Sequence, residues 1–245
     1  MSGVRARVAH LAFWRPALRV LCYHRIVPSA ADSLSVTAEA FRQQLFLLTA
    51  AGYTPVKLSD VAGREPLPAR PVLITFDDGY VDTLEHAAPI LEDAGFPAAV
   101  FVVTKYLGDR ARWDEGGAAL MDAAQLHALS ERGFEIALHS HAHRRFDQLT
   151  LPDITEDLTT SLRHLRSLGI EPAKALAYPY GARPKRSMAA MVTALEGLGL
   201  QLAFRLGNRL NRLPLTDPFE VQRLIVTGEM NLKAFEGLVF HGRMP

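Results

Sequence analysis

Short apolar segments alternate along this chain with longer segments of helical periodicity, and this alternation constrains the fold most. Seven apolar segments have the length of strands, at residues 18–23, 72–76, 98–103, 134–138, 175–178, 201–205 and 221–226. Apolar residues at helical spacing occur between them, at residues 38–51, 82–94, 123–132, 153–168 and 187–198. Strands separated by helices favour a parallel sheet, so the sequence predicts an α/β fold.

Composition agrees with one enzyme domain. The chain has 245 residues, 49% of them hydrophobic, which is enough for one large core. The 27 basic and 26 acidic residues give a net charge of +1, so bulk charge predicts no nucleic acid partner. Cys22 is the sole cysteine, which excludes an internal disulfide and leaves the compartment open. We expect Thr37 to cap the first helix, and Gly133 and Gly169 to end two others.

Two adjacent carboxylates, Asp77 and Asp78, follow the second apolar segment and precede Gly79. Neighbouring side chains of a strand point to opposite faces, so both aspartates cannot be surface groups of a buried strand. A glycine turn lets both carboxylates lean toward one cavity above the carboxyl ends of the strands. Each carboxylate raises the pKa of the other, and a cation relieves this repulsion. In isolation, an Asp-Asp-Gly sequence is more often a surface turn.

A histidine cluster, His139-Ser140-His141-Ala142-His143, follows the fourth apolar segment. Two imidazoles four positions apart can converge on one ion from a curled loop, whereas His139 and His141 would diverge in an extended chain. We assign His141 no ligand role. Two imidazole nitrogens and one aspartate oxygen suit zinc, nickel, cobalt or iron, and leave positions open for water and substrate. Strand ends share one side of an α/β sheet, so the sequence predicts a catalytic metal site.

These residues carry a family resemblance. The chain resembles the polysaccharide deacetylase family, carbohydrate esterase family 4, in its Thr-Phe-Asp-Asp-Gly block at residues 75–79 and in residues 139–143. Residues 177–181 match in part a third family motif, in the form found in the branch that acts on bacterial exopolysaccharide. The resemblance implies a single-domain distorted (β/α)7 barrel at residues 18–245, after a basic N-terminal segment at residues 1–17.

The resemblance also implies a role for each site residue. Asp77 would be the general base, and Asp78, His139 and His143 would hold a divalent metal. Zinc is the favoured metal, with nickel and cobalt as alternatives. The metal would activate water for attack on an acetamide carbonyl, and Asp77 would accept the proton. The backbone N–H of Tyr180 would stabilise the oxyanion.

The chain departs from the family pattern at two positions. Ala177 stands where many relatives have an arginine that orients the catalytic aspartate, so Asp77 needs another partner or stands freer. The late histidine that serves as general acid in many relatives is missing from residues 223–226. His24, at the end of the first predicted strand, is a candidate for this role, with a buried structural histidine as the alternative. His241 is a second candidate, although its position favours a tail residue.

The first seventeen residues are basic, with apolar side chains interspersed: Arg5, Arg7, Leu11, Phe13, Trp14 and Arg15. They are too interrupted for a secretory signal or a membrane span, so we expect a cytoplasmic protein by default. Such a segment usually packs on its own domain, and peripheral contact with a membrane surface is the alternative.

The resemblance implies a metal-dependent hydrolase that removes N-acetyl groups from N-acetylhexosamine units of a bacterial polysaccharide or glycolipid precursor. Two alternatives stay open: hydrolysis of an O-acetyl ester or a small amide at the same site, and a catalytically silent carbohydrate-binding module. Asp77 argues against the silent module, because a site that only binds does not need an extra carboxylate. Four aromatic residues in or near predicted rim loops suit a glycan: Tyr80, Trp113, Tyr178 and Tyr180.

Overall fold

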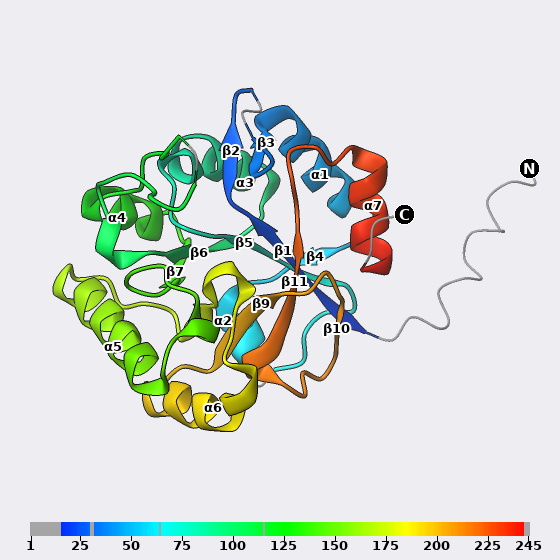
Figure 1. Cartoon of the computed structure of the whole chain (residues 1–245). Coiled ribbons are helices and arrows are strands. Elements are labelled where there is room, and N and C mark those ends of the chain that lie inside the picture. Colours follow the sequence, from blue (N-terminus) through cyan, green and yellow to red (C-terminus); the bar gives the residue numbers. More distant parts are fainter. Residues whose placement is uncertain (1–15, 30–31, 64, 115, 243–245) are drawn as a thin grey trace, which may run out of the picture.

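Seven parallel strands form a closed barrel in the computed structural model, which describes residues 16–242 except 30–31, 64 and 115 (Figure 1). The barrel strands are β1 (Ala17–Tyr23), β5 (Pro71–Phe76), β6 (Ala98–Val102), β7 (Glu135–Leu138), β8 (Ala175–Ala177), β9 (Leu202–Leu206) and β11 (Val221–Ile225). Each pairs with the next in this order, and β1 pairs with both β5 and β11, which closes the ring. The predicted α/β class and (β/α)7 barrel are therefore confirmed.

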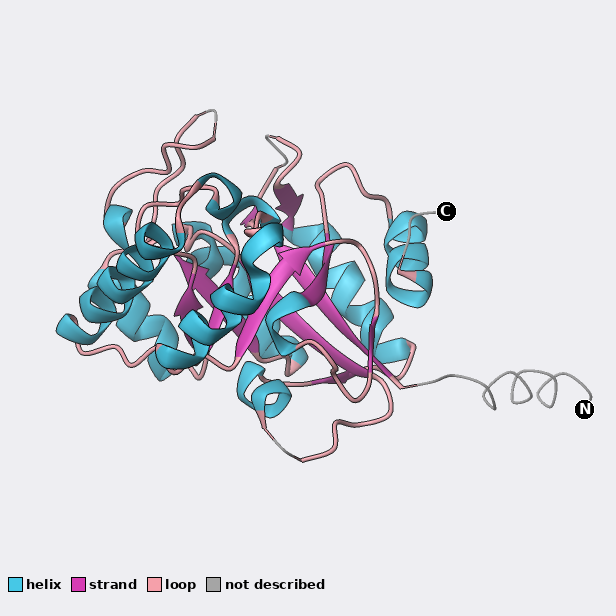
Figure 2. Cartoon of the chain, turned by 60° about the horizontal axis from the view of Figure 1, so that its bottom comes forward, coloured by secondary structure: helices cyan, strands magenta, loops and turns pink. Residues whose placement is uncertain are grey.

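Helices surround the barrel (Figure 2). They are α1 (Ala38–Ala50), α2 (Leu58–Ala62), α3 (Ala88–Ala94), α4 (Ala123–Glu131), α5 (Leu151–Ser167), α6 (Met188–Gly197) and α7 (Leu232–His241). Thr37 caps α1 as expected, because its hydroxyl accepts a hydrogen bond from the Ala40 N–H. A π-helical turn at Thr83–Ala87 replaces the first part of the helix predicted at residues 82–94.

Several short elements were not predicted, because two or three residues give no detectable periodicity. β4 (Thr54–Pro55) extends the sheet beside β5, and β10 (Asn211–Arg212) pairs antiparallel with β1. β2 (Arg25–Val27) and β3 (Ser35–Thr37) form a separate parallel pair. α7 also lacked a prediction. It packs beside α1, so His241 belongs to a helix and not to a tail (Figure 1).

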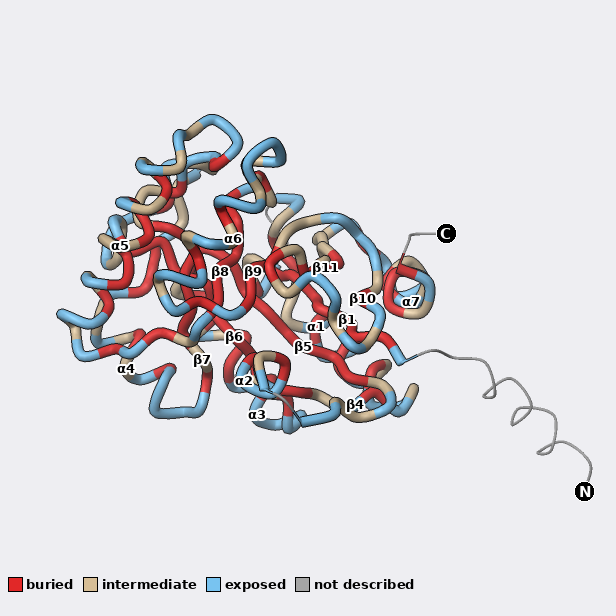
Figure 3. Tube along the Cα trace, turned by 90° about the horizontal axis from the view of Figure 1, so that it is seen from below, coloured by how far each residue is buried: buried red, intermediate tan, exposed pale blue. Residues whose placement is uncertain are grey.

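The barrel strands are buried on both faces (Figure 3). On β5, Val72 and Ile74 pack in the cluster that includes the surrounding helices, whereas Leu73 packs in the cluster inside the barrel. Because strand side chains alternate, Thr75 and Asp77 continue the inward row toward the carboxyl end. The same alternation continues from Val221 to Arg223 on β11. The interior is thus apolar at one end and polar at the other, where the site lies.

No helix among the described residues is long and apolar enough to cross a membrane. Residues 1–15 of the basic N-terminal segment predicted at residues 1–17 lie outside the described part of the chain, so the expectations about its packing or membrane contact remain predictions.

Candidate active site

A left-handed turn after β5 presents both aspartates to the same side. The Asp77 N–H donates to the Tyr23 carbonyl at 3.0 Å, which continues the pairing with β1. The backbone then turns at Asp78, with φ of 72°, and at Gly79, with φ of 84°. A Cβ atom on Gly79 would lie 3.0 Å from Val102 Cγ1, so both the conformation and the close approach require glycine. The two neighbouring carboxylates therefore face one site.

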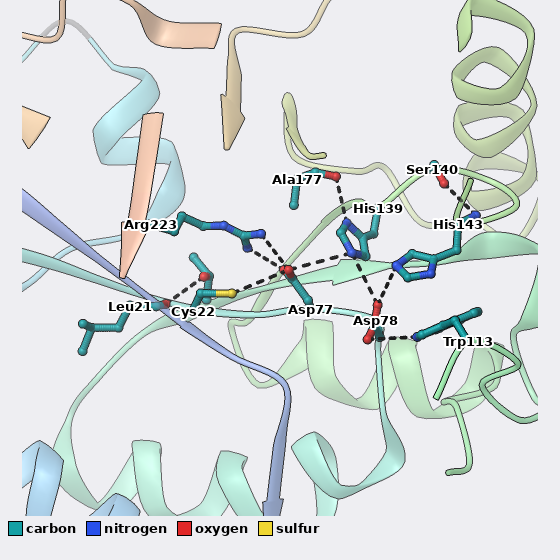
Figure 4. A network of polar contacts seen from close by, with 11 residues as sticks. Leu21, Cys22, Asp77, Asp78, Trp113, His139, Ser140, His143, Ala177 and Arg223 are labelled. Atoms are coloured by element: carbon teal, nitrogen blue, oxygen red, sulfur yellow. Dashed lines mark hydrogen bonds and ion pairs between the residues drawn. The ribbon is translucent and has the colours of Figure 1, made fainter. Parts of the chain in front are cut away.

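Three predicted ligands meet at this end of the barrel (Figure 4). Asp78 Oδ1 lies 3.4 Å from His139 Nε2 and 3.3 Å from His143 Nε2. All three side chains are buried, with relative exposures of 3% for Asp78, 2% for His139 and 6% for His143. The ligand atoms lie within 4.8 Å of one another, so the structure brings together residues that the sequence separates by some sixty positions.

The protonation of these groups fits a divalent metal. His139 Nδ1 hydrogen-bonds to the Ala177 carbonyl at 2.8 Å, so this nitrogen carries the proton of the neutral ring and leaves Nε2 with a lone pair. Burial lowers the pKa of His139. Burial, and secondarily the neighbouring imidazole of His139, lower the pKa of His143 to about 2, so both rings are neutral at pH 7. Asp78 Oδ1 has no hydrogen-bond partner among the described residues. Ligand atoms about 2.0–2.1 Å from a tetrahedral zinc lie about 3.3 Å apart, which matches both separations.

The histidine loop is held by polar contacts at its backbone. The His143 N–H donates to Ser140 Oγ at 2.9 Å. Buried Asp157 of α5 accepts the His141 N–H at 2.7 Å and the Ala142 N–H at 3.2 Å. His141 Nδ1 hydrogen-bonds to the Thr104 hydroxyl at 2.9 Å and takes no part in the three-ligand set.

Strained backbone is concentrated around the site. Five non-glycine residues of the described chain have positive φ, and four of them belong to the motifs discussed here: Asp78, Ser140, His143 and Tyr180. Such conformations cost of order 1–3 kcal/mol each and persist where the surroundings enforce them, often at functional sites. The strain supports the view that these loops are shaped for function.

Asp77 has a partner that the sequence interpretation left open. Arg223 of β11 donates to both its carboxylate oxygens, at 2.5 and 2.6 Å, and both side chains are buried (Figure 4). Burial alone would raise the pKa of Asp77, but the charge and hydrogen bonds of Arg223 hold it below the usual range. The guanidinium carbon also lies 5.6 Å from the centroid of the buried Phe101 ring. The sequence did contain a signal for this partner, because Arg223 is a charged residue inside the predicted apolar strand at residues 221–226.

Removing this guanidinium is expected to destabilise the protein strongly. Arg223→Met leaves Asp77 as an unpaired buried charge, which typically costs about 3–5 kcal/mol. Without Arg223, burial would raise the pKa of Asp77. The loss of stability should therefore be larger at neutral pH than below pH about 4, where the Asp77 carboxyl of the variant is protonated in both the folded and the unfolded state. Urea unfolding in the presence of chelator measures this. Arg166→Met, which breaks the exposed pair with Glu171, is the control and should change little. Equal stability of the Arg223 variant and the parent would contradict the expectation.

Metal affinity is expected to depend on pH through Asp78. Burial, together with the charge of Asp77, raises the pKa of Asp78 to about 8. A metal binds the ionised carboxylate and so displaces one proton below this pH, whereas His139 and His143 are already neutral. Zinc affinity should rise about tenfold per pH unit from about pH 6 to about pH 8 and then level off. Chelator competition at several pH values tests this slope, and a constant affinity would contradict it.

In the metal-free protein the pH dependence has the opposite sign. The folded state retains the Asp78 proton up to about pH 8, whereas the unfolded state loses it near pH about 4. The unfolded state therefore binds fewer protons between these values, and the free energy of unfolding falls as pH rises. Metal binding offsets this loss.

His24 lies beside Asp77. It follows β1, and its ligand atom, Cys22 Sγ and an Asp77 oxygen lie within 4.8 Å of one another. Its Nδ1 is buried without a hydrogen-bond partner among the described residues, and burial lowers its pKa to about 4, so the ring is neutral at pH 7. The Cys22 thiol donates to Asp77 Oδ2 at 3.6 Å. Because Arg223 already neutralises Asp77, this trio is poorly suited to hold a second cation.

The aromatic residues expected at the rim divide into two groups. Tyr80 and Tyr178 are buried, and their hydroxyls donate to Asp114 Oδ2 at 2.7 Å and to the Phe219 carbonyl at 3.0 Å, so both are packing residues. Tyr180 is 45% exposed, and its ring lies 4.6 Å from the ring of His143. Trp113 is half-buried, and its ring lies 4.1 Å from the ring of His143.

The turn that carries Tyr180 is packed tightly against β9. Gly181 has φ of 63°, and a Cβ atom there would lie 2.8 Å from the Leu206 nitrogen. Only glycine permits this approach, which holds the turn of Pro179–Gly181 close to the barrel. Tyr180 is thereby brought to the same rim as His143, and the expected role of its N–H as an oxyanion donor stays a prediction.

Known proteins resemble this chain in sequence and in structure. A family model described as Polysaccharide deacetylase matches residues 64–202, more than half of the chain. YxkH of Bacillus subtilis is 28% identical over 181 residues, or 72% of this chain and 61% of that protein, so the chain spans less than two thirds of YxkH. Poly-beta-1,6-N-acetyl-D-glucosamine N-deacetylase of Staphylococcus epidermidis is 27% identical over 217 residues, 84% of this chain and 71% of that enzyme. IcaB from Ammonifex degensii matches with a TM-score of 0.76 and 25% identity, over 93% of this chain and 97% of that one.

Proposed function

Because the chain belongs to the polysaccharide deacetylase family, we propose that it is a metal-dependent hydrolase that removes N-acetyl groups from N-acetylhexosamine units of a bacterial glycan or glycolipid precursor. The observation that supports this most is a buried carboxylate, Asp77, outside the three-ligand set but next to it. A purely structural metal site has four protein ligands, whereas three leave room for water and substrate.

Asp78, His139 and His143 would hold the metal, and zinc suits their two nitrogens and one oxygen best, with nickel and cobalt as alternatives. When bound, such an ion would polarise the acetamide carbonyl and activate water. Asp77 would accept the proton of the attacking water. Arg223 keeps Asp77 ionised and fixes the orientation of its carboxylate, at the expense of basicity. The Tyr180 N–H would stabilise the oxyanion.

His24 would return the proton to the leaving amine. The His24 ring is neutral, so it must gain a proton before it can donate one. The neighbouring Asp77, which would have taken a proton from the attacking water, would pass that proton to His24. We expect His24→Gln to lower kcat by about 10²–10⁴-fold while zinc content is retained, as for the loss of a general acid. His241→Gln, which tests the other candidate histidine, should leave kcat unchanged. The opposite pattern would assign the role to His241.

Acetate release decides between the proposed function and its alternatives. The zinc-loaded protein is incubated with N-acetylated and O-acetylated oligosaccharides, and loss of acetyl groups is followed by mass spectrometry. The Staphylococcus epidermidis relative is named for poly-beta-1,6-N-acetyl-D-glucosamine, so this polymer is the first substrate, followed by peptidoglycan fragments and lipid-linked sugars. Asp77→Asn protein prepared in parallel excludes contaminating activity. Faster release from O-acetyl esters would favour an esterase, and glycan binding without release would favour a binding module.

A further inference from the structure

Trp113 lies outside the three-ligand set but contacts two of its members, Asp78 and His143. Its indole N–H donates to Asp78 Oδ2 at 3.2 Å (Figure 4). Its ring lies 4.1 Å from the ring of His143, centroid to centroid, at an interplanar angle of 42°. Both contacts come from a long connection between β6 and α4 and not from a strand end.

The hydrogen bond determines which oxygen of Asp78 is free. The imidazole nitrogens of His139 and His143 approach Oδ1, whereas Trp113 engages Oδ2. With Oδ2 occupied by a donor, the carboxylate offers a metal one oxygen in a defined direction.

The two histidine ligands are oriented in different ways, His139 by a hydrogen bond and His143 by contact with aromatic rings. His139 is oriented by the bond from its Nδ1 to the Ala177 carbonyl. His143 Nδ1 is buried and has no such partner among the described residues. Aromatic rings flank His143 instead: Trp113 at 4.1 Å and Tyr180 at 4.6 Å. The orientation of His143 therefore depends on packing by these rings.

The connection that carries Trp113 is itself well anchored. The Met121 N–H donates to the Gly79 carbonyl at 2.9 Å, directly after Asp78 in the chain. Asp114, the next residue after Trp113, accepts a hydrogen bond from buried Tyr80 at 2.7 Å. Tyr106 packs against the indole at 5.6 Å. The indole is thus placed by contacts with the same turn that holds the aspartates.

We infer that Trp113 is a positioning residue of the metal centre, which selects Asp78 Oδ1 as the ligand atom and holds the ring of His143 in its binding orientation. This inference rests on the metal site of the proposed function. It concerns metal affinity, so it can fail while acetate release still occurs.

Zinc affinity of three variants tests the inference. Trp113→Phe keeps a ring beside His143 but removes the N–H, and Trp113→Leu removes both. Loss of a group that orients a metal ligand typically costs about 10–100-fold in affinity, so we expect a weakening in this range for Phe and a larger one for Leu. Tyr106→Phe, in the same aromatic cluster but without a hydrogen bond to Asp78, should bind zinc like the parent. Chelator competition measures all four proteins, and parental affinity in both Trp113 variants would overturn the inference.

Fluorescence provides a test that leaves Trp113 intact. The chain has two tryptophans, Trp14 and Trp113, so Trp14→Phe makes Trp113 the sole indole. Zinc should then change its emission, with an endpoint at one ion per chain, and the additional change Asp78→Asn should abolish the response. Unchanged emission at zinc concentrations that chelator competition shows to be saturating would overturn the inference. If the parent protein binds no zinc at all, the metal site of the proposed function falls together with it.

Discussion

Replacing His139 by alanine is expected to remove the metal and to reduce acetate release to background. His139 is buried, its Nδ1 is engaged by Ala177, and its Nε2 faces Asp78 Oδ1, so its replacement leaves only two of the three candidate ligands. Loss of an outer partner of a ligand costs about 10–100-fold in affinity, so loss of the ligand itself should cost more than about 100-fold. Elemental analysis after dialysis and acetate release at equal protein concentration measure the two effects.

The middle histidine of the same loop provides a matched control. His141 bonds to Thr104 and lies outside the ligand set, so His141→Ala should retain metal and most of the activity. His143→Ala should behave like His139→Ala. Stoichiometric zinc in His139→Ala, or loss of zinc in His141→Ala but not in His143→Ala, would show that the ligand set is wrong.

Asp77→Asn should lower kcat by about 10²–10⁴-fold, the usual contribution of a general base, while the metal is retained. The amide has the size of the carboxylate but cannot accept the proton of water. Asp77 is also distinct from the ligands, because its nearest approach to His139 Nε2, 3.8 Å, is longer than that of Asp78. Acetate release and zinc content are measured on the same preparation.

The substitution also leaves Arg223 as a buried cation without its counter-ion, so the variant will unfold at lower urea concentration. Assays therefore need a temperature at which the variant is folded, verified by its unfolding curve. Activity within tenfold of the parent in folded, zinc-loaded protein would rule out Asp77 as the base. Loss of zinc would instead make Asp77 a ligand.

Asp77 and Asp78 should become protonated at different pH values on acidification. Arg223 keeps the pKa of Asp77 below its usual range, so this carboxylate stays ionised in mild acid. Asp78 in the metal-free protein takes up a proton far more readily. Loss of activity on acidification should therefore follow loss of metal and not protonation of the base.

The sequence predicted the barrel strands well, because parallel strands buried on both faces are nearly continuous apolar segments. The predicted strand at residues 98–103, for example, is observed at Ala98–Val102. Short elements escaped prediction: β10, with two residues, has no period of its own and exists only because β1 lies beside it. The family resemblance stated from the motifs is confirmed.

Local motifs located the candidate site, because Asp77, Asp78, His139 and His143 directly follow strands whose ends meet. The roles of Arg223 and Trp113 could not be predicted in the same way. Arg223 reaches Asp77 only because β11 closes the barrel beside β1, and Trp113 reaches Asp78 along an irregular connection. Both contacts depend on the path of the whole chain and not on spacing within a segment.

The ion pair between Asp77 and Arg223 has a consequence for synthesis on the ribosome, since its partners are 146 positions apart. A nascent chain that has emerged only as far as β9 already contains every candidate ligand, yet its barrel is open and its inward carboxylate lacks a counter-ion. Insertion of β11 closes the ring and neutralises this charge in one event. Catalytic competence should therefore arise late and all at once, after the last barrel strand leaves the exit tunnel.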